Sequence, residues 1–159
     1  MKNTVNQTTH FGFQTVPESE KANKVQNVFT SVAGKYDIMN DIMSAGIHRI
    51  WKDKFIDWMN PSPSSSLIDV ASGTGDIAKK FSLRNKNLSM ITCVEPNEDM
   101  FKKGKSNLVN FKNIKWIMSR AESLPVEDNM YDFYTISYGI RNVSDINKTL
   151  KEAYRVLKP

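Results

Sequence analysis

Apolar side chains recur at two different spacings along the chain, and the spacing changes at residues 61–66. Before this point they recur every three or four residues, which predicts helices from about residue 19, around 36–44 and over 47–59. We expect the last of these helices to place five apolar side chains on one face, namely Ile47, Ile50, Trp51, Phe55 and Trp58.

The segment 61–66 (PSPSSS) is typical of a linker. After it, short apolar runs alternate with helical patterns, as in repeated strand–helix units, which form a parallel sheet with helices on both faces. The predicted elements are strands over 67–70, 90–94, 114–118 and 131–137, and helices from 76, over 97–109 and over 144–157.

These patterns divide the chain into an N-terminal arm (1–18), a helical cap (19–60) and an α/β core (66–159). The last helix reaches the end of the chain, at the point where a further strand of a doubly wound sheet would begin. We therefore expect a truncated sequence, an incomplete sheet and a core of low stability.

The composition narrows the class of protein. The 159 residues fit one globular domain, and no apolar run is long enough to cross a bilayer. The N-terminus lacks an export or transit pattern and Cys93 is the single cysteine, so we expect a cytoplasmic protein. One cysteine and two histidines argue against a metal site. The net charge of +5 is spread along the chain, which favours a solvated surface over nucleic-acid binding, while the lysines at 102–105 leave peripheral membrane contact open.

A glycine-rich loop follows the first core strand. Asp69 lies near the end of this strand, and Gly73-Thr74-Gly75 provides the tight turn into the next helix. The loop alone also fits a dinucleotide site, because Ala78 completes that pattern and Glu95 lies 20 residues past Gly75.

Asp76 favours a different cofactor. At a helix N-terminus its carboxylate would repel a pyrophosphate, whereas S-adenosyl-L-methionine has no phosphate and carries a sulfonium cation. A simple helix cap would explain Asp76, but not Asp69, Glu95 and the loop together. We therefore predict a Rossmann-like class I S-adenosylmethionine-dependent methyltransferase, with a dinucleotide oxidoreductase as the alternative.

The remaining cofactor contacts are expected at the carboxyl ends of the strands. Glu95 would accept the ribose hydroxyls, Arg120-Ala121 would flank the adenine, and Ser137 would lie near the methyl group. The predicted cofactor-binding residues are Asp69, Gly73, Thr74, Gly75, Glu95, Arg120, Ala121 and Ser137.

Longer motifs surround these residues, and they are more specific than the loop. They are THFGF at 9–13, VAGKYDIMND at 32–41, SAGIHR at 44–49, AESLP at 121–125 and ISYGIRNV at 136–143. With them, nearly the whole chain resembles the ubiquinone/menaquinone biosynthesis C-methyltransferases, and THFGF resembles the ubiquinone-pathway members.

The resemblance implies C-methylation of a polyprenylated benzoquinol of the 2-polyprenyl-6-methoxy-1,4-benzoquinol type. Methylation of demethylmenaquinol is one alternative, and a non-catalytic scaffold subunit in a quinone-biosynthesis complex is another. Two positions depart from the family pattern. Ser72 replaces a common glycine, which is harmless if its φ is negative, and Arg120 replaces an Asn or Asp. Because arginine accepts no hydrogen bond, the adenine contact there falls to the backbone and Ala121.

Three residues are candidates for the chemistry. Transfer to a ring carbon is favoured when a quinol hydroxyl loses its proton, so a cation that stabilises the phenolate and a base are both expected. Arg141, with Asn142 beside it, is predicted to stabilise that oxyanion, and His48 is the candidate base, with a surface role as its alternative. The apolar residues Val28, Phe29, Trp51 and Trp58 are expected to pack in the core, with a channel for the isoprenoid tail as the alternative.

Overall fold

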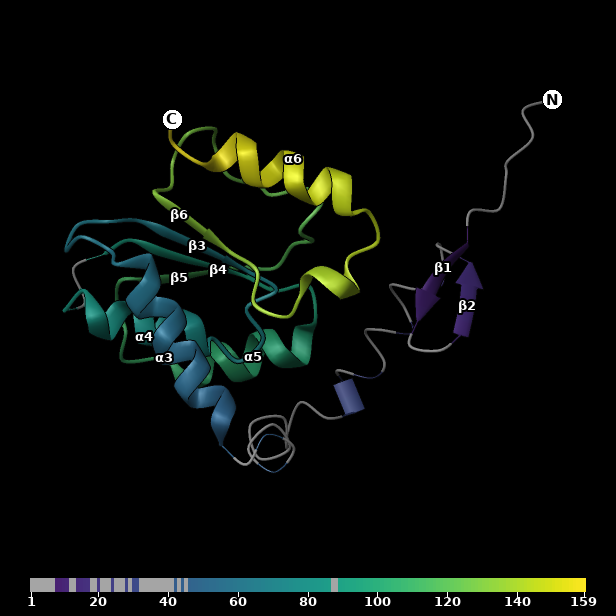
Figure 1. The fold of residues 1–159 in the computed structure, drawn as a ribbon, viewed down its shortest axis with the longest axis horizontal. Coiled ribbons are helices and arrows are strands. Elements are labelled where there is room, and N and C mark those ends of the chain that lie inside the picture. The colour runs from purple at the N-terminus through teal and green to yellow at the C-terminus, as the bar shows by residue number, and fades with distance from the viewer. Residues whose placement is uncertain are drawn as a thin grey trace.

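A series of helices and strands begins at Ile47 in the computed structural model of the chain (Figure 1). The structure describes residues 8–11, 14–17, 46–86 and 89–159, together with the single residues 20, 24, 28, 30, 31, 42 and 44. The main elements are α3 (Ile47–Met59), β3 (Leu67–Val70), α4 (Asp76–Arg84), β4 (Ile91–Val94), α5 (Glu98–Asn107), β5 (Ile114–Ile117), β6 (Phe133–Thr135), the 3-10 helix η2 (Ile140–Asn142) and α6 (Ile146–Val156).

The strands of the core form a parallel sheet with the order β5-β4-β3-β6. Leu67 of β3 lies opposite Ile91 of β4 on one side and Phe133 of β6 on the other. The chain therefore runs outward from β3 through β4 to β5, and then crosses back to place β6 on the far side of β3. This reversal is a topological switch point, where open α/β sheets bind their ligands. The predicted α/β fold is confirmed.

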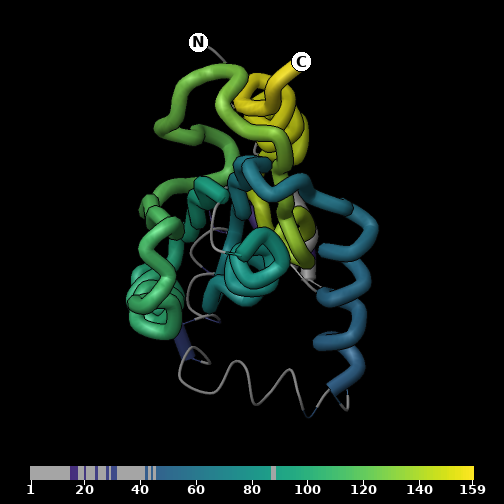
Figure 2. Tube along the Cα trace, turned by 90° about the vertical axis from the view of Figure 1, so that its left-hand side faces the viewer, coloured from purple at the N-terminus to yellow at the C-terminus, as the bar shows by residue number. Residues whose placement is uncertain are grey.

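Alternating residues of the strands form two apolar layers, one on each face of the sheet. Leu67, Ile91 and Cys93 pack with Phe81 of α4 in one layer. In the other layer, Ile68 and Val94 pack with Val156 of α6. Figures 1 and 2 show α3, α4 and α5 on one side of the sheet and α6 on the other. Within the described residues, every helix is too short or too polar to span a membrane.

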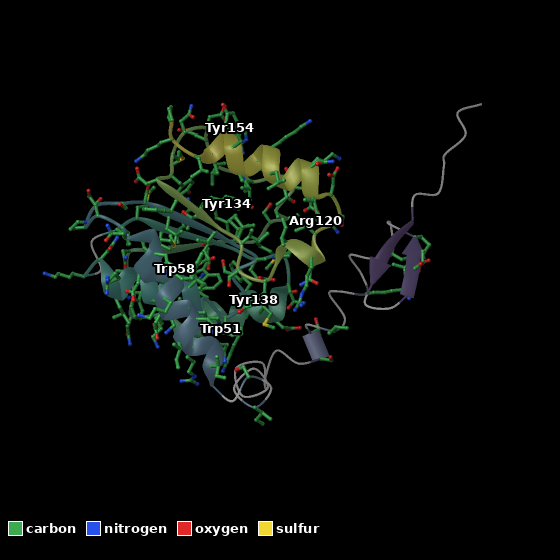
Figure 3. The ribbon with its side chains drawn as sticks, viewed as in Figure 1. Trp51, Trp58, Arg120, Tyr134, Tyr138 and Tyr154 are labelled. Atoms are coloured by element: carbon green, nitrogen blue, oxygen red, sulfur yellow. The ribbon has the colours of Figure 1, made fainter. Side chains whose placement is uncertain are left out.

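The predicted core face of α3 is largely wrong. Ile56 is its fully buried residue, and Phe55 and Met59 pack beside it against the core. Trp51 and Trp58 are 60% and 83% exposed (Figure 3), and Ile47 and Ile50 are also exposed. Core packing of Trp51, Trp58 and the half-exposed Val28 is therefore not what the structure shows. Phe29 lies outside the described residues.

Two short strands lie within the predicted N-terminal arm. β1 (Thr8–Phe11) and β2 (Gln14–Pro17) pair as an antiparallel hairpin. Residues 20, 24, 28, 30 and 31 are helical, in agreement with the predicted helix from about residue 19, and so are 42 and 44. The predicted turn of helix at 36–41 lies outside the described residues, and the division into arm, cap and core stays a prediction.

Candidate functional site

The glycine-rich loop has the backbone geometry that its sequence requires. Gly73 and Gly75 have φ angles of 56° and 83°, in the left-handed region that glycine adopts without strain, and Ala71 also has a positive φ of 53°. Ser72 is not among the positive-φ residues, so the serine that replaces glycine is accommodated. A Cβ at Gly73 would have no heavy atom within 4 Å, so a ligand can approach the loop there.

Glu95 ties the end of β4 to this loop. The backbone N–H of Gly73 donates to its Oε2 at 2.8 Å, and that of Asn97 donates to Oε1 at 2.9 Å. Burial raises the pKa of Glu95, and these two hydrogen bonds oppose the rise. Because each carboxylate oxygen can accept more than one hydrogen bond, Glu95 keeps acceptor capacity for two ribose hydroxyls.

Asp69 lies beneath the loop, with only 1% of its surface exposed. Thr135 Oγ1, at the end of β6, donates to its Oδ1 at 2.7 Å, while Oδ2 is buried without a hydrogen-bond partner. Burial raises the pKa of Asp69 to about 7, against the opposing effects of Thr135 and of the Lys52 charge. The structure therefore places Asp69 as a support between β3 and β6, and not on a surface open to ligand.

The predicted fourth strand is too long. β6 ends at Thr135, so Ser137 lies two residues further on, in a turn. This turn presses on the glycine loop, because a Cβ at Gly139 would lie 2.6 Å from Cβ of Ala71. It leads directly into η2, where Arg141 is exposed and Asn142 is half-buried. The structure thus brings the turn and the start of η2 to the loop.

The end of β5 and helix α5 complete the surroundings. Arg120 is exposed and Ala121 is buried, and both follow β5 at the carboxyl end of the sheet (Figure 3). α5 approaches the loop closely, since a Cβ at Gly104 would lie 3.0 Å from the carbonyl oxygen of Gly73. Gly104 has no positive φ, so its small size is what the contact needs. The sequence pattern had not singled out this residue.

Asp76 is the first residue of α4, as predicted, but its side chain does not cap the helix. The N-cap is Gly75, and Oδ2 of Asp76 contacts Nζ of Lys52 on α3 at 2.8 Å. His48 lies one turn earlier on α3, where its Nδ1 is 2.6 Å from Oγ of Ser44. Lys52 was missed by the sequence reasoning. Among the described residues, no group of His, Cys, Asp and Glu side chains could hold a metal ion.

A family model matches residues 17–159, with the description ubiE/COQ5 methyltransferase family. The chain belongs to this family. A ubiquinone/menaquinone biosynthesis C-methyltransferase from Ruegeria is 52% identical to it over 96% of the chain, and one from Rickettsia bellii is 51% identical over 95%. The chain spans 62% and 63% of the lengths of these two relatives. A solved structure of a SAM-dependent methyltransferase from Thermotoga maritima is 25% identical to the chain, with a TM-score of 0.61. The match covers 83% of this chain and 56% of the Thermotoga chain.

Membership of the ubiE/COQ5 family confirms the predicted resemblance, the Rossmann-like methyltransferase fold and S-adenosyl-L-methionine as the cofactor. The donor set fits this molecule. Glu95 suits a ribose, and Gly73 leaves room for close approach of the cofactor. The alternative of a dinucleotide oxidoreductase is therefore set aside.

Proposed function

We propose that this chain carries the cofactor site and reaction centre of an S-adenosylmethionine-dependent C-methyltransferase that acts on a polyprenylated benzoquinol in ubiquinone biosynthesis. The observation that carries the proposal is the meeting of β3, β4 and β6 at one loop, through the Glu95–Gly73 hydrogen bond and the contact of Gly139 with Ala71. When bound, the cofactor supplies the methyl group. The predicted contacts at Thr74, Arg120-Ala121 and Ser137 are part of this proposal.

Arg141 is proposed to stabilise the phenolate form of the quinol. Its exposed guanidinium stands in η2, two residues after the glycine that packs on the cofactor loop. An oxyanion on the ring raises the electron density of the carbon that accepts the methyl group. Asn142 is proposed to orient the same hydroxyl.

His48 is proposed as the base that takes the quinol proton. It lies four residues before Lys52 on α3, so the two share a face of the helix, and Lys52 reaches the start of α4 beside the loop. The 2.6 Å contact between Ser44 Oγ and Nδ1 of His48 would fix the orientation of the imidazole ring.

The test is methyl transfer to demethylated benzoquinol and naphthoquinol analogues, with product analysis by mass spectrometry. We expect methylation of the benzoquinol, and a loss of about 100-fold or more in turnover for Arg141→Ala, in the range of lost oxyanion stabilisation. Methylation of the naphthoquinol alone would favour the demethylmenaquinol alternative, to which the names of the relatives also point. Cofactor binding without turnover on either substrate would favour the scaffold.

Peripheral contact with the inner membrane is proposed through the outward face of α3. Ile50, Trp51 and Trp58 are exposed there (Figure 3), and tryptophan favours the level of lipid headgroups. Binding to anionic vesicles that weakens on Trp51→Ser and Trp58→Ser substitution would support this contact, and unchanged binding would remove it.

A further inference from the structure

Lys52 is a largely buried lysine next to the cofactor loop. Its side chain is 15% exposed, and its Nζ lies 2.8 Å from Oδ2 of Asp76, the first residue of α4. Its charge also acts on buried Asp69, where it opposes the rise in pKa that burial causes. Lysine is rarely buried unless its charge is paired, and Asp76 is itself 35% exposed and can satisfy only part of the ammonium group.

Other ion pairs already join α3 to α4. Lys80 contacts Asp53 at 2.5 Å, and Arg84 contacts Asp57 at 3.0 Å. In both, the cation is on α4 and the acid on α3. Lys52–Asp76 reverses this order, and it is the pair at the end of the seam that meets the glycine loop. At the loop end of the seam, α3 therefore presents a cation where the other two pairs have an acid on this helix.

The cofactor has a matching charge at this place. With its ribose at Glu95, after β4, and its adenine at Ala121, after β5, its methionine end must point the other way, towards the end of β3 and the start of α4. That end carries an ammonium and a carboxylate. The acids Asp69 and Asp76 cannot bind the carboxylate, whereas Lys52 can.

We propose that Lys52 binds the α-carboxylate of the methionine moiety of S-adenosyl-L-methionine and that Asp76 holds the ammonium group of Lys52 in place. The three N–H donors of the lysine allow it to keep Asp76 and to contact the carboxylate at once. This role rests on the cofactor orientation of the proposed function. It makes Lys52 a residue that selects for the complete amino-acid end of the cofactor.

The test compares two ligands by titration calorimetry. S-adenosylhomocysteine carries the carboxylate, and S-adenosyl-3-thiopropylamine is the same molecule without it. Wild-type protein should bind S-adenosylhomocysteine about 10- to 100-fold more tightly, as expected for a charged hydrogen bond. Lys52→Met should lose most of this ratio by weakening S-adenosylhomocysteine alone, and Lys52→Arg should retain part of it.

Lys80→Met is the matched control, because it removes a cation from the same helix pair away from the loop. It should leave the ratio unchanged. If Lys52→Met does not fold, Lys52→Gln, which keeps a hydrogen-bond donor for Asp76, is expected to lose the ratio in its place. Equal weakening of both ligands by these variants would overturn the role of Lys52 while leaving the cofactor site intact. Failure of wild-type protein to bind either ligand would overturn the proposed site and this role together.

Discussion

Ionisation of Asp69 should weaken the fold as the pH rises, and the size of the effect follows from its burial. The pKa of Asp69 is raised from 3.8 to about 7 in the folded protein. At about 1.4 kcal/mol for each pH unit, this difference corresponds to about 4 kcal/mol. Between pH 4 and pH 7 the unfolded chain releases this proton while the folded protein keeps it. The free energy of unfolding therefore falls over that range, and the contribution levels off above pH 7.

Asp69→Asn removes this titration and keeps the shape of the side chain. The amide oxygen can still accept the hydrogen bond from Thr135, but the amide N–H₂ takes the place of the unpartnered Oδ2, at a cost of about 1–3 kcal/mol at every pH. We expect the variant to be less stable than wild type at pH 4 and to overtake it near pH 8.

Urea unfolding followed by tryptophan fluorescence from pH 4 to pH 8 measures this effect. The difference in free energy of unfolding, variant minus wild type, should rise by up to about 4 kcal/mol over the range. Thr135→Val is the control, because it removes a hydrogen bond that lowers the pKa of Asp69 and should extend the fall of stability to higher pH. A variant difference that does not change with pH would refute the reasoning.

Other expectations concern the packing around the same sheet. Asp132 has a pKa lowered to about 2 by hydrogen bonds from the backbone and from the lysine near the C-terminus. In urea titrations, Asp132→Asn should therefore be less stable than wild type above pH 4. The difference in free energy of unfolding should shrink as the pH falls towards 2, because the wild-type protein loses stability there. Gly104→Ala should cost about 1–3 kcal/mol, less the gain of about 1 kcal/mol in helix propensity, and should weaken binding of S-adenosylhomocysteine, because the new Cβ crowds Trp116 and the carbonyl of Gly73. An unaltered calorimetric affinity for S-adenosylhomocysteine would contradict the expected loss of binding in Gly104→Ala. Arg155 binds two carboxylates and two carbonyl oxygens, and 28% of its side chain is exposed. Arg155→Ala should therefore lower the melting temperature and reduce the free energy of unfolding by about 2 kcal/mol. A reduction below about 0.5 kcal/mol would show that this network adds little to stability.

The sheet could be predicted from the sequence because each strand is a short apolar run between polar turns. Residues 67–70 are all buried, and the predicted strands at 90–94 and 114–118 lie within one residue of the observed ones. The exception is the strand predicted over 131–137, of which the ladder uses only Phe133–Thr135. Tyr131 forms an isolated bridge with Leu157 instead. An apolar run cannot reveal how many of its residues find a partner strand.

The loop and the acid after β4 could likewise be predicted, since their chemistry is local. Gly73 donates its backbone N–H to Glu95, and both Gly73 and Gly75 have the positive φ angles of a tight turn. Thr135 could not be found, because a buried threonine in a strand is ordinary until a carboxylate lies beside it. Gly104 could not be found either, since a glycine inside a helix shows its purpose only when the neighbouring loop is in place.

The orientation of α3 shows what a search for apolar periodicity overlooks. The buried face is turned by roughly 100°, one residue position, from the predicted one. Three charges on α4, at 76, 80 and 84, recur every four residues and face three opposite charges on α3, at 52, 53 and 57. These pairs and buried Ile56 agree on one orientation, which leaves the tryptophans outside and brings Lys52 to the loop. The complementary charge patterns were present in the sequence, but only the contact between two helices separated by a strand gives them meaning. The same rotation of α3 exposes the two tryptophans and places Lys52 beside the loop. A change that turned α3 back would therefore be expected to bury the tryptophans and to remove Lys52 from the loop together.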